Sequence, residues 1–215
     1  SFSVSASEEN VSKLIVQGEG KVSAVPDMAT VVLGVEARNA SALVAAKENA
    51  RLMNETISAL LSSGIASADI QTSHFSLTSL PQEETKATGE NQIAPEFIAT
   101  SQVTVRLNNT ADVGRVLDAA AAAGSNSIKD LNFDIRNPQP EKDRALTLAI
   151  ADARRKAEVA AKAAGVELGR VLEIAEGYGY VTPAAKSAIQ FDVATPVQPG
   201  EMEVTASVTL TYEVS

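Results

Sequence analysis

The sequence predicts an α+β fold in which a mainly antiparallel sheet is covered by about three helices, in the order ββαββαβαββ. Three observations carry this prediction. A helical pattern, a glycine and an alternating run follow one another at Gly64, Gly124 and Gly165. Residues 28–135 read βαββαβ, which is the order of a ferredoxin-like segment. The last strand alternates strictly between apolar and polar side chains, as antiparallel strands with one buried face do.

The chain opens on two predicted strands. The first is expected over residues 13–25, where Gly18 and Gly20 indicate a bulge or the close approach of another element. The second is expected over residues 28–37, after a Pro-Asp turn signal. Because the connection is this short, the two strands are expected to pair as a hairpin.

One helix and a long strand pair are expected next. The helix is predicted over residues 40–63 and is ended by Gly64. Strands are predicted over residues 69–79 and 97–107, joined by the polar loop 80–96. The apolar stripe of the helix consists of Leu43, Ala46, Ala50, Met53, Ile57 and Leu60.

A second helix and a fifth strand complete the ferredoxin-like segment. The helix is expected over residues 111–123, with Asn109 or Thr110 as its cap and Gly124 after it. The strand is expected over residues 129–135. The inward face of the helix is predicted to hold Val113, Val116, Leu117 and Ala120.

The longest helical pattern runs from Asn137 to Gly165 and is expected to seal the sheet. Asn137 can cap its start, Pro138 fits the first helical position, and Gly165 can end it in a left-handed conformation. Because the apolar face is mostly alanine, the helix is expected to lie close to the strands it covers. That face is predicted to consist of Leu146, Ile150, Ala153, Ala157, Ala160 and Ala164.

The C-terminal part supplies the candidate interaction residues. A strand over 171–175, an irregular segment over 177–200 and a last strand over 202–214 are expected. The irregular segment begins with two tyrosines, a residue type that anchors interfaces, and the last strand has a polar, threonine-rich face. The candidate interaction residues are Tyr178, Tyr180, Thr205, Thr209 and Thr211.

The composition excludes several kinds of site and partner. The 215 residues include no cysteine, which removes disulfides, thiolate catalysis and zinc–thiolate sites. The net charge is −9 and there is no basic tract, so nucleic acid is not expected as a partner. No apolar run approaches the roughly 18 residues of a transmembrane segment. Residues 1–12 are small and polar, and are interpreted as a mobile lead-in to one domain over residues 13–215.

No catalytic residue, cofactor site or metal site is predicted. The only histidine, His74, falls on the polar face of its strand and is interpreted as solvated. Zinc and iron sites need several His or Cys ligands, which the chain does not offer. The run Gly18–Lys21 lacks the first glycine and the hydroxyl residue of a phosphate loop. Asp152 and Glu158 each have a lysine four residues on, and these are interpreted as solvated helix pairs.

Several stretches, taken in their order and spacing, resemble the SIMPL-domain family, a domain of unknown function. Its bacterial members include periplasmic oxidative-stress-defence and periplasmic immunogenic proteins. The resemblance implies a mixed α/β fold, export behind a signal peptide, ring- or channel-like homo-oligomers and a stress-protective role, with no catalytic residues to assign. It covers residues 13–215 and is carried by IVQGEGKVSAVPDMATVVLGVEA (15–37), GIASADIQTSHFSL (64–77), FIATSQVTVRLNN (97–109), GSNSIKDLNFDI (124–135), ALTLAIADARRKAEVAAKAAGVELGRVLEI (145–174) and PGEMEVTASVTLTYEV (199–214).

Two functional hypotheses follow. The first is a non-enzymatic periplasmic or extracellular protein that self-associates through strand edges or polar strand faces, in cell-envelope or oxidative-stress protection. The second is a binding module for a small ligand or a cell-envelope component, which would use the loops 80–96 and 177–200. A hydrolase is disfavoured, because no nucleophile or metal constellation is present.

Overall fold

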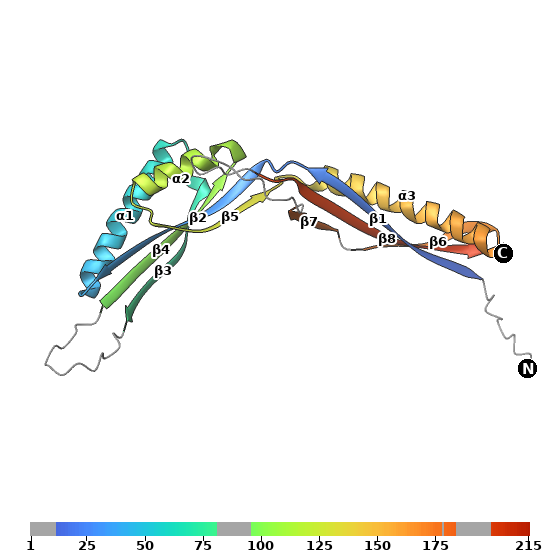
Figure 1. Cartoon of the computed structure of the whole chain (residues 1–215), viewed down its shortest axis with the longest axis horizontal. Helices are drawn as coiled ribbons and strands as arrows, with labels where there is room; N and C mark the ends of the chain where they lie inside the picture. The colour runs from blue at the N-terminus through green and yellow to red at the C-terminus, as the bar shows by residue number, and fades with distance from the viewer. Residues whose placement is uncertain (1–11, 81–95, 178, 184–198) are drawn as a thin grey trace, which may run out of the picture. The chain divides into compact units, whose positions relative to one another are not determined.

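The computed structural model describes residues 12–80, 96–177, 179–183 and 199–215. Within these residues, three α-helices and eight strands form two antiparallel sheets (Figure 1), which confirms the predicted α+β fold and its element order. Most of the lead-in, most of the loop 80–96 and Tyr178 lie outside the described residues. The elements are β1 (Lys13–Ala24), β2 (Met28–Asn39), α1 (Ala42–Ser62), β3 (Ile70–Leu80), β4 (Glu96–Leu107), α2 (Val113–Ala122), β5 (Ser127–Asp134), α3 (Gln139–Ala164), β6 (Leu168–Glu176), β7 (Tyr180–Pro183) and β8 (Met202–Val214).

The chain divides into two compact units. Of the described residues, the first unit takes 12–25, 137–177, 179–183 and 200–215, and the second takes 26–80, 96–136 and 199. The strands β1 and β2 belong to different sheets, so the predicted hairpin between them is wrong. Each strand instead finds partners that follow α1 or α3 in the sequence, a choice that the short connection between them does not reveal.

The second unit has the predicted ferredoxin-like arrangement. Its sheet order is β3-β4-β2-β5, and every neighbouring pair is antiparallel. The helices α1 and α2 supply the other half of its core. Asn109 caps the short 3-10 turn before α2 by accepting a hydrogen bond from the amide of Ala111. The buried core residues are Ala29, Val31, Leu33, Val35, Met53, Leu60, Val103, Val105, Leu107, Val113, Val116, Leu117 and Ala120.

The buried face of α1 differs from its predicted stripe. Leu43 is exposed, whereas Asn49 is buried beneath the helix. The side-chain amide of Asn49 donates to the carbonyls of Val35 and Ala99 at 2.8 and 2.9 Å, and its oxygen accepts from the Ser101 hydroxyl at 2.7 Å. A polar residue can belong to this core because both polar atoms of its side chain have hydrogen-bond partners there.

The first unit places α3 over a sheet with the order β1-β8-β6, in which the short strand β7 also pairs with β8. The strand β7 lies in the segment predicted to be irregular, so that prediction is wrong for residues 180–183. The last strand has its predicted bounds and its predicted alternation. Its buried residues are Met202, Val204, Ala206, Val208, Leu210, Thr211 and Tyr212.

Close packing of α3 on the sheet is confirmed, but with a shifted set of alanines. Ala153 and Ala157 are buried as predicted, while Ile150 is exposed and Ala164 lies at the exposed end of the helix. The buried stripe repeats every four residues, so it forms a single ridge of the helix surface, and the helix packs on β1 and β8. It consists of Ala145, Ala149, Ala153, Ala157 and Ala161.

Gly18 and Gly20 are the strand counterpart of this stripe. The register of β1 with β8 is continuous, so the glycines do not form a bulge. A Cβ on Gly18 would collide with the backbone of Ala149, and one on Gly20 would collide with the backbone of Ala145. The expected close approach is thereby confirmed, and Gly165 ends the helix in the left-handed region at φ 71°.

Candidate interaction surface

The threonines of β8 lie on the sheet face opposite α3. Gly18 and Gly20 face the helix and pair with Val208 and Ala206, so the alternate residues of β8 point to the other side. Thr205 and Thr209 are half-buried on that side. Thr211 is only 7% exposed, so it offers little surface within a single chain.

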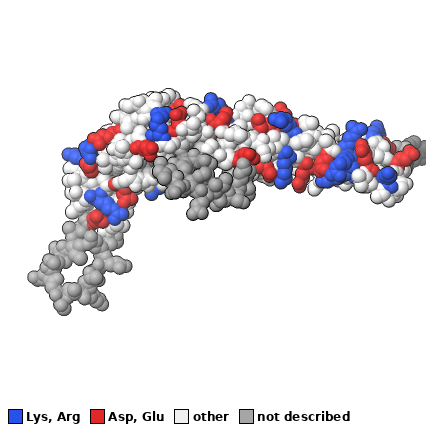
Figure 2. Space-filling model, turned by 45° about the horizontal axis from the view of Figure 1, so that its top comes forward, with Lys and Arg blue, Asp and Glu red and all other residues white. Residues whose placement is uncertain are grey.

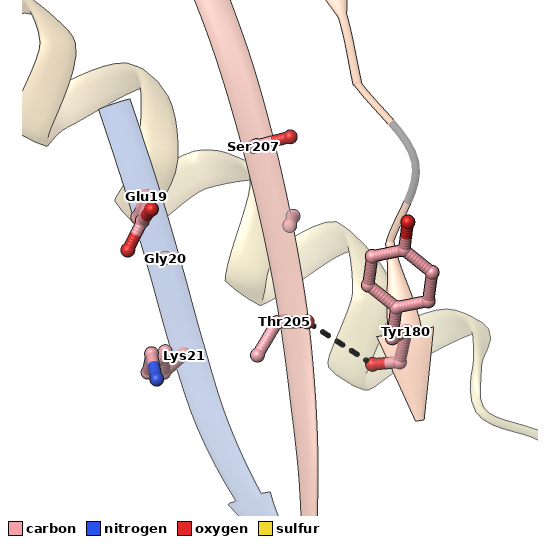
Figure 3. A pocket seen from close by; sticks show the side chains of 7 residues that line it. Glu19, Gly20, Lys21, Tyr180, Thr205 and Ser207 are labelled. Atoms are coloured by element: carbon pink, nitrogen blue, oxygen red, sulfur yellow. Dashed lines mark hydrogen bonds between the residues drawn. The ribbon is translucent and has the colours of Figure 1, made fainter. Parts of the chain in front are cut away.

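Tyr180 and Thr205 are brought together, while Thr209 and Thr211 lie farther along the strand. Tyr180 is the residue of β7 that pairs with Thr205, and the Thr205 hydroxyl donates to the Tyr180 carbonyl at 3.4 Å (Figure 3). The ring of Tyr180 is 62% exposed. The pairing of β7 with β8 explains why these two predicted residues meet. The sequence signal for β7 is the pair Tyr180 and Val181, which follows Gly177 and Gly179.

A shallow pocket of about 300 Å³ lies beside these two residues. Glu19 and Lys21 of β1 flank it on one side, and Ser207 extends it along β8 (Figure 3). Lys21 is paired with Glu203 at 3.3 Å. The pocket therefore combines hydroxyl donors, one carboxylate, one ammonium group and an exposed aromatic ring, a set that suits a polar, hydroxyl-rich ligand.

One edge of the same sheet is closed by side chains of α3. The Asp152 carboxylate accepts from the amide of Glu19 at 3.2 Å, and the Lys156 ammonium donates to the carbonyl of Gln17 at 3.0 Å. Asp152 also binds Lys156 at 2.7 Å and Arg155 at 2.6 Å. Hydrogen bonds from Lys156 and Arg155, followed by the one from the Glu19 amide, hold the pKa of the Asp152 carboxyl well below its usual range. The prediction that Asp152 is merely a solvated helix charge is therefore incomplete.

Glu158 behaves differently from its prediction. It pairs with Arg154, four residues before it, at 3.3 Å, and not with the lysine four residues after it. Both side chains are more than half exposed. This pair is a solvated surface contact of the kind that contributes little to stability.

The free edge of the other sheet is of a different character. Strand β3 lies at the edge of its sheet and contains no Lys, Arg, Asp or Glu. Phe75 and Leu77 are 59% and 44% exposed, and Leu80 is exposed as well. Sequence reasoning placed Phe75 and Leu77 on one face of the strand but missed that this face is uncovered, because only the tertiary structure shows that α1 lies over β2 and β4.

Charged side chains elsewhere are mostly paired. On the face shown in Figure 2, acidic and basic side chains are interspersed, with a basic group toward the end of the view that carries the C-terminal half of α3.

The described residues offer no metal site. Among them, no group of three or more His, Asp or Glu side chains is placed to hold a metal ion. His74 is exposed on β3. None of the helices in the described part of the chain has the length and apolarity needed to cross a membrane.

Comparison with known proteins identifies the family of this chain. The family model "Protein of unknown function (DUF541)", SIMPL, matches residues 14–212. The 26 kDa periplasmic immunogenic protein of Brucella melitensis is 32% identical over 213 residues, which span 94% of this chain and 84% of that protein. The uncharacterized protein YggE of Edwardsiella ictaluri is 30% identical, over 75% of this chain and 66% of that protein. YggE of Escherichia coli K12 is 26% identical, over 87% and 75%. The chain belongs to the SIMPL (DUF541) family, which has no known catalytic activity.

Proposed function

We propose that this chain is an exported, non-enzymatic protein of the periplasm that self-associates through the free edge of strand β3. The observation that carries the proposal is the composition of that edge. It is an 11-residue edge strand without a charged residue, and Phe75 and Leu77 expose large apolar side chains beside it. An edge of this kind is a template for pairing with another chain.

The contrast with the other sheet edges supports this choice. On β1, Asp152 accepts from the amide of Glu19 and Lys156 donates to the carbonyl of Gln17, so the middle of this edge is covered. On β5, the carboxylates of Asp130 and Asp134 accept from the amides of the residues that follow them. Strand β6 carries Arg, Glu and two register shifts. Charges, bulges and covering groups are the devices by which proteins prevent edge pairing, and β3 carries only a single register shift near its start.

Export and a role in the cell envelope are proposed from the relatives. The Brucella proteins similar to this chain are named as periplasmic, which supports a periplasmic location reached behind a signal peptide. Protection of the envelope under oxidative stress is the process we propose for the assembly. The non-enzymatic role is supported by the exposed position of the only histidine and by a family without known catalytic activity.

Sedimentation velocity over the micromolar range tests the self-association. The wild-type chain is expected to sediment as species larger than the 22.4 kDa monomer. Replacing both Phe75 and Leu77 with lysine is expected to give monomers with an unchanged circular dichroism spectrum, because like charges would meet across the paired edge.

Ile15→Lys provides the matched control. Ile15 is 63% exposed, but it lies on β1, whose edge is closed by α3. The control is expected to assemble like the wild type. A strictly monomeric wild type would contradict the proposal, as would equal loss of association in the control.

A second candidate function is a binding module for a hydroxyl-rich envelope component, such as a glycan fragment. The observation that favours it is the exposed ring of Tyr180 beside Thr205 and Ser207 in the pocket of Figure 3. The predicted loops 80–96 and 177–200 lie mostly outside the described residues, so the pocket alone supports this candidate. A rise in melting temperature with peptidoglycan fragments that Tyr180→Ala abolishes is the expected result. No shift in the wild type would exclude it.

A further inference from the structure

The helix α3 covers only part of its sheet and leaves an apolar groove beside strand β6. The glycines of β1 draw the helix over β1 and β8. Val171 and Ile174 pair with Tyr212 and Leu210, so they point to the same face as the helix. Both are nevertheless exposed, and Ile174 is 62% exposed. An uncovered apolar face inside a helix–sheet layer is a feature that needs a physical explanation.

The groove has a volume of about 620 Å³. Ile150 and Arg154 of α3 form one wall, Val171 and Ile174 of β6 form the other, and Tyr212 contributes to the lining from β8. This volume lies within the range of small-molecule sites. Because the Gly–Ala packing places the helix over β1 and β8, it leaves the groove open beside β6.

Tyr212 carries the polar group that gives the groove its chemistry. Its side chain is 95% buried, since only 5% of the residue is exposed. Among the described residues, the Tyr212 hydroxyl forms no hydrogen bond with a protein group. Every fully buried side-chain polar atom in this part of the chain has a partner, so the Tyr212 hydroxyl is not fully buried. Because Tyr212 lines the groove, a ligand bound there can accept a hydrogen bond from this hydroxyl.

Two guanidinium groups lie at the rim. Arg154 uses its Nε to bind Glu158 at 3.3 Å, and Arg170 uses its Nε to bind Glu213 at 3.0 Å. Both arginine side chains are more than 70% exposed. Glu158 also lines the groove, so each arginine lies beside a carboxylate that partly neutralises it. The terminal amino groups of the two guanidinium groups, which form no other ion pair among the described residues, are the donors that could bind an anion next to the apolar walls.

We propose that the groove between α3 and β6 binds a single-chain amphiphile with a carboxylate head, that is, a free long-chain fatty acid. The alkyl chain lies against Ile150, Val171 and Ile174. The carboxylate accepts a hydrogen bond from the Tyr212 hydroxyl and an ionic hydrogen bond from a rim arginine. A peptide strand is a poorer occupant, because the register shifts and the charges of β6 oppose edge pairing.

The proposal is tested on the full chain with dansyl-labelled undecanoic acid as the probe. Fluorescence is expected to rise saturably and to fall when unlabelled dodecanoate is added. Ile174→Glu is expected to weaken binding by about tenfold or more, because it places a charge against the alkyl chain. Ile15→Glu is the matched control: Ile15 is 63% exposed on the opposite face of the same sheet and should bind like the wild type.

The head-group contact is tested separately. Tyr212→Phe keeps the ring and removes only the hydroxyl, so it should weaken dodecanoate by roughly tenfold and leave dodecanol unchanged. A purely structural role of Tyr212 would weaken both ligands alike. Absence of saturable binding, or equal loss in Ile15→Glu, would overturn the proposal. Repeating the titration in the Phe75→Lys, Leu77→Lys background separates this outcome from failure of self-association, because those changes lie in the other unit.

Discussion

Small residues decide how α3 meets its sheet. Each alanine of the buried stripe is at most 3% exposed, and Gly18 and Gly20 face the helix backbone directly. Removing side chains on both sides lets the helix axis approach the strands, so close packing replaces the bulk of a leucine-rich interface. The stability of the first unit therefore depends on glycine and alanine at positions where a larger side chain would hold the helix away from the strands.

Gly18→Ala tests this dependence at the level of one methyl group. The new Cβ would collide with the backbone of Ala149, and a backbone atom cannot move aside as a side chain can. We expect a loss of about 1–3 kcal/mol in the free energy of unfolding, measured by urea denaturation. Gly200→Ala is the control in the same unit, since a Cβ there has no neighbour within 4 Å. Equal stability of the two variants would contradict the close-packing explanation.

At the residue scale, the sequence predicts the kind of packing better than it predicts which residues of the helix are buried. The alanine-rich pattern indicates close packing and the glycines indicate close approach, and both are confirmed. The predicted stripe began at Leu146 and included Ile150, yet the buried row begins at Ala145. Hydrophobicity points toward the larger side chains, but here Ile150 lines the groove and the alanines face the sheet.

At the element scale, the strand edges differ in how they are protected. On β1, the amide of Glu19 and the carbonyl of Gln17 are bound by side chains of α3, whereas β3 has no charged residue along its length. This difference cannot be read from strand patterns alone. It depends on Asp152 lying three residues beyond Ala149 on a helix whose distance from β1 is set by glycine.

Asp152→Asn tests the closure of the β1 edge. The pKa of Asp152 is held well below its ordinary value of 3.8 by Lys156, Arg155 and the amide of Glu19. A carboxyl whose pKa is lowered on folding adds stability above its unfolded pKa and loses it as the pH falls through the folded pKa. The wild type should therefore be more stable than the variant at about pH 7, and the difference should shrink below about pH 4.

Urea denaturation at several pH values measures this difference. Glu158→Gln is the control, because Glu158 forms an exposed ion pair with Arg154 on the helix surface. It should unfold like the wild type at neutral pH. A gap between wild type and Asp152→Asn that stays constant down to about pH 2 would contradict the assigned role of the carboxylate.

Pairing between elements is predictable only where the chain connects neighbours locally. The β3–β4 hairpin and the ferredoxin-like order follow from element sequence and are confirmed. The partner of β1 is β8, at the other end of the chain, and a strand pair so distant leaves no local signal. The same reason hides the groove and the Tyr180 pocket, because each combines side chains from three separated elements.

At the scale of the whole molecule, the two units differ in how the chain builds them. Apart from residue 199, the described residues of the second unit come from 26–80 and 96–136, and the buried cluster of its core lies wholly between Ala29 and Ala120. The first unit needs both ends of the chain, because β8 is its central strand. The two parts of the molecule are thus expected to differ in whether they can fold as fragments.

The fragment 26–136 is therefore expected to fold on its own. Its ends are held together, since the Asp27 amide donates to the Asp134 carbonyl at 3.1 Å and the Arg136 amide donates to the Asp27 carboxylate at 2.7 Å. A fragment with joined ends and its own buried cluster is expected to fold independently. We expect a single cooperative transition in urea, monitored by circular dichroism, and a sheet-plus-helix spectrum. The complementary fragment 137–215 lacks β1 and should remain unfolded, because the glycine face on which α3 packs would be missing. A gradual, non-cooperative transition of 26–136 would show that its core depends on the rest of the chain.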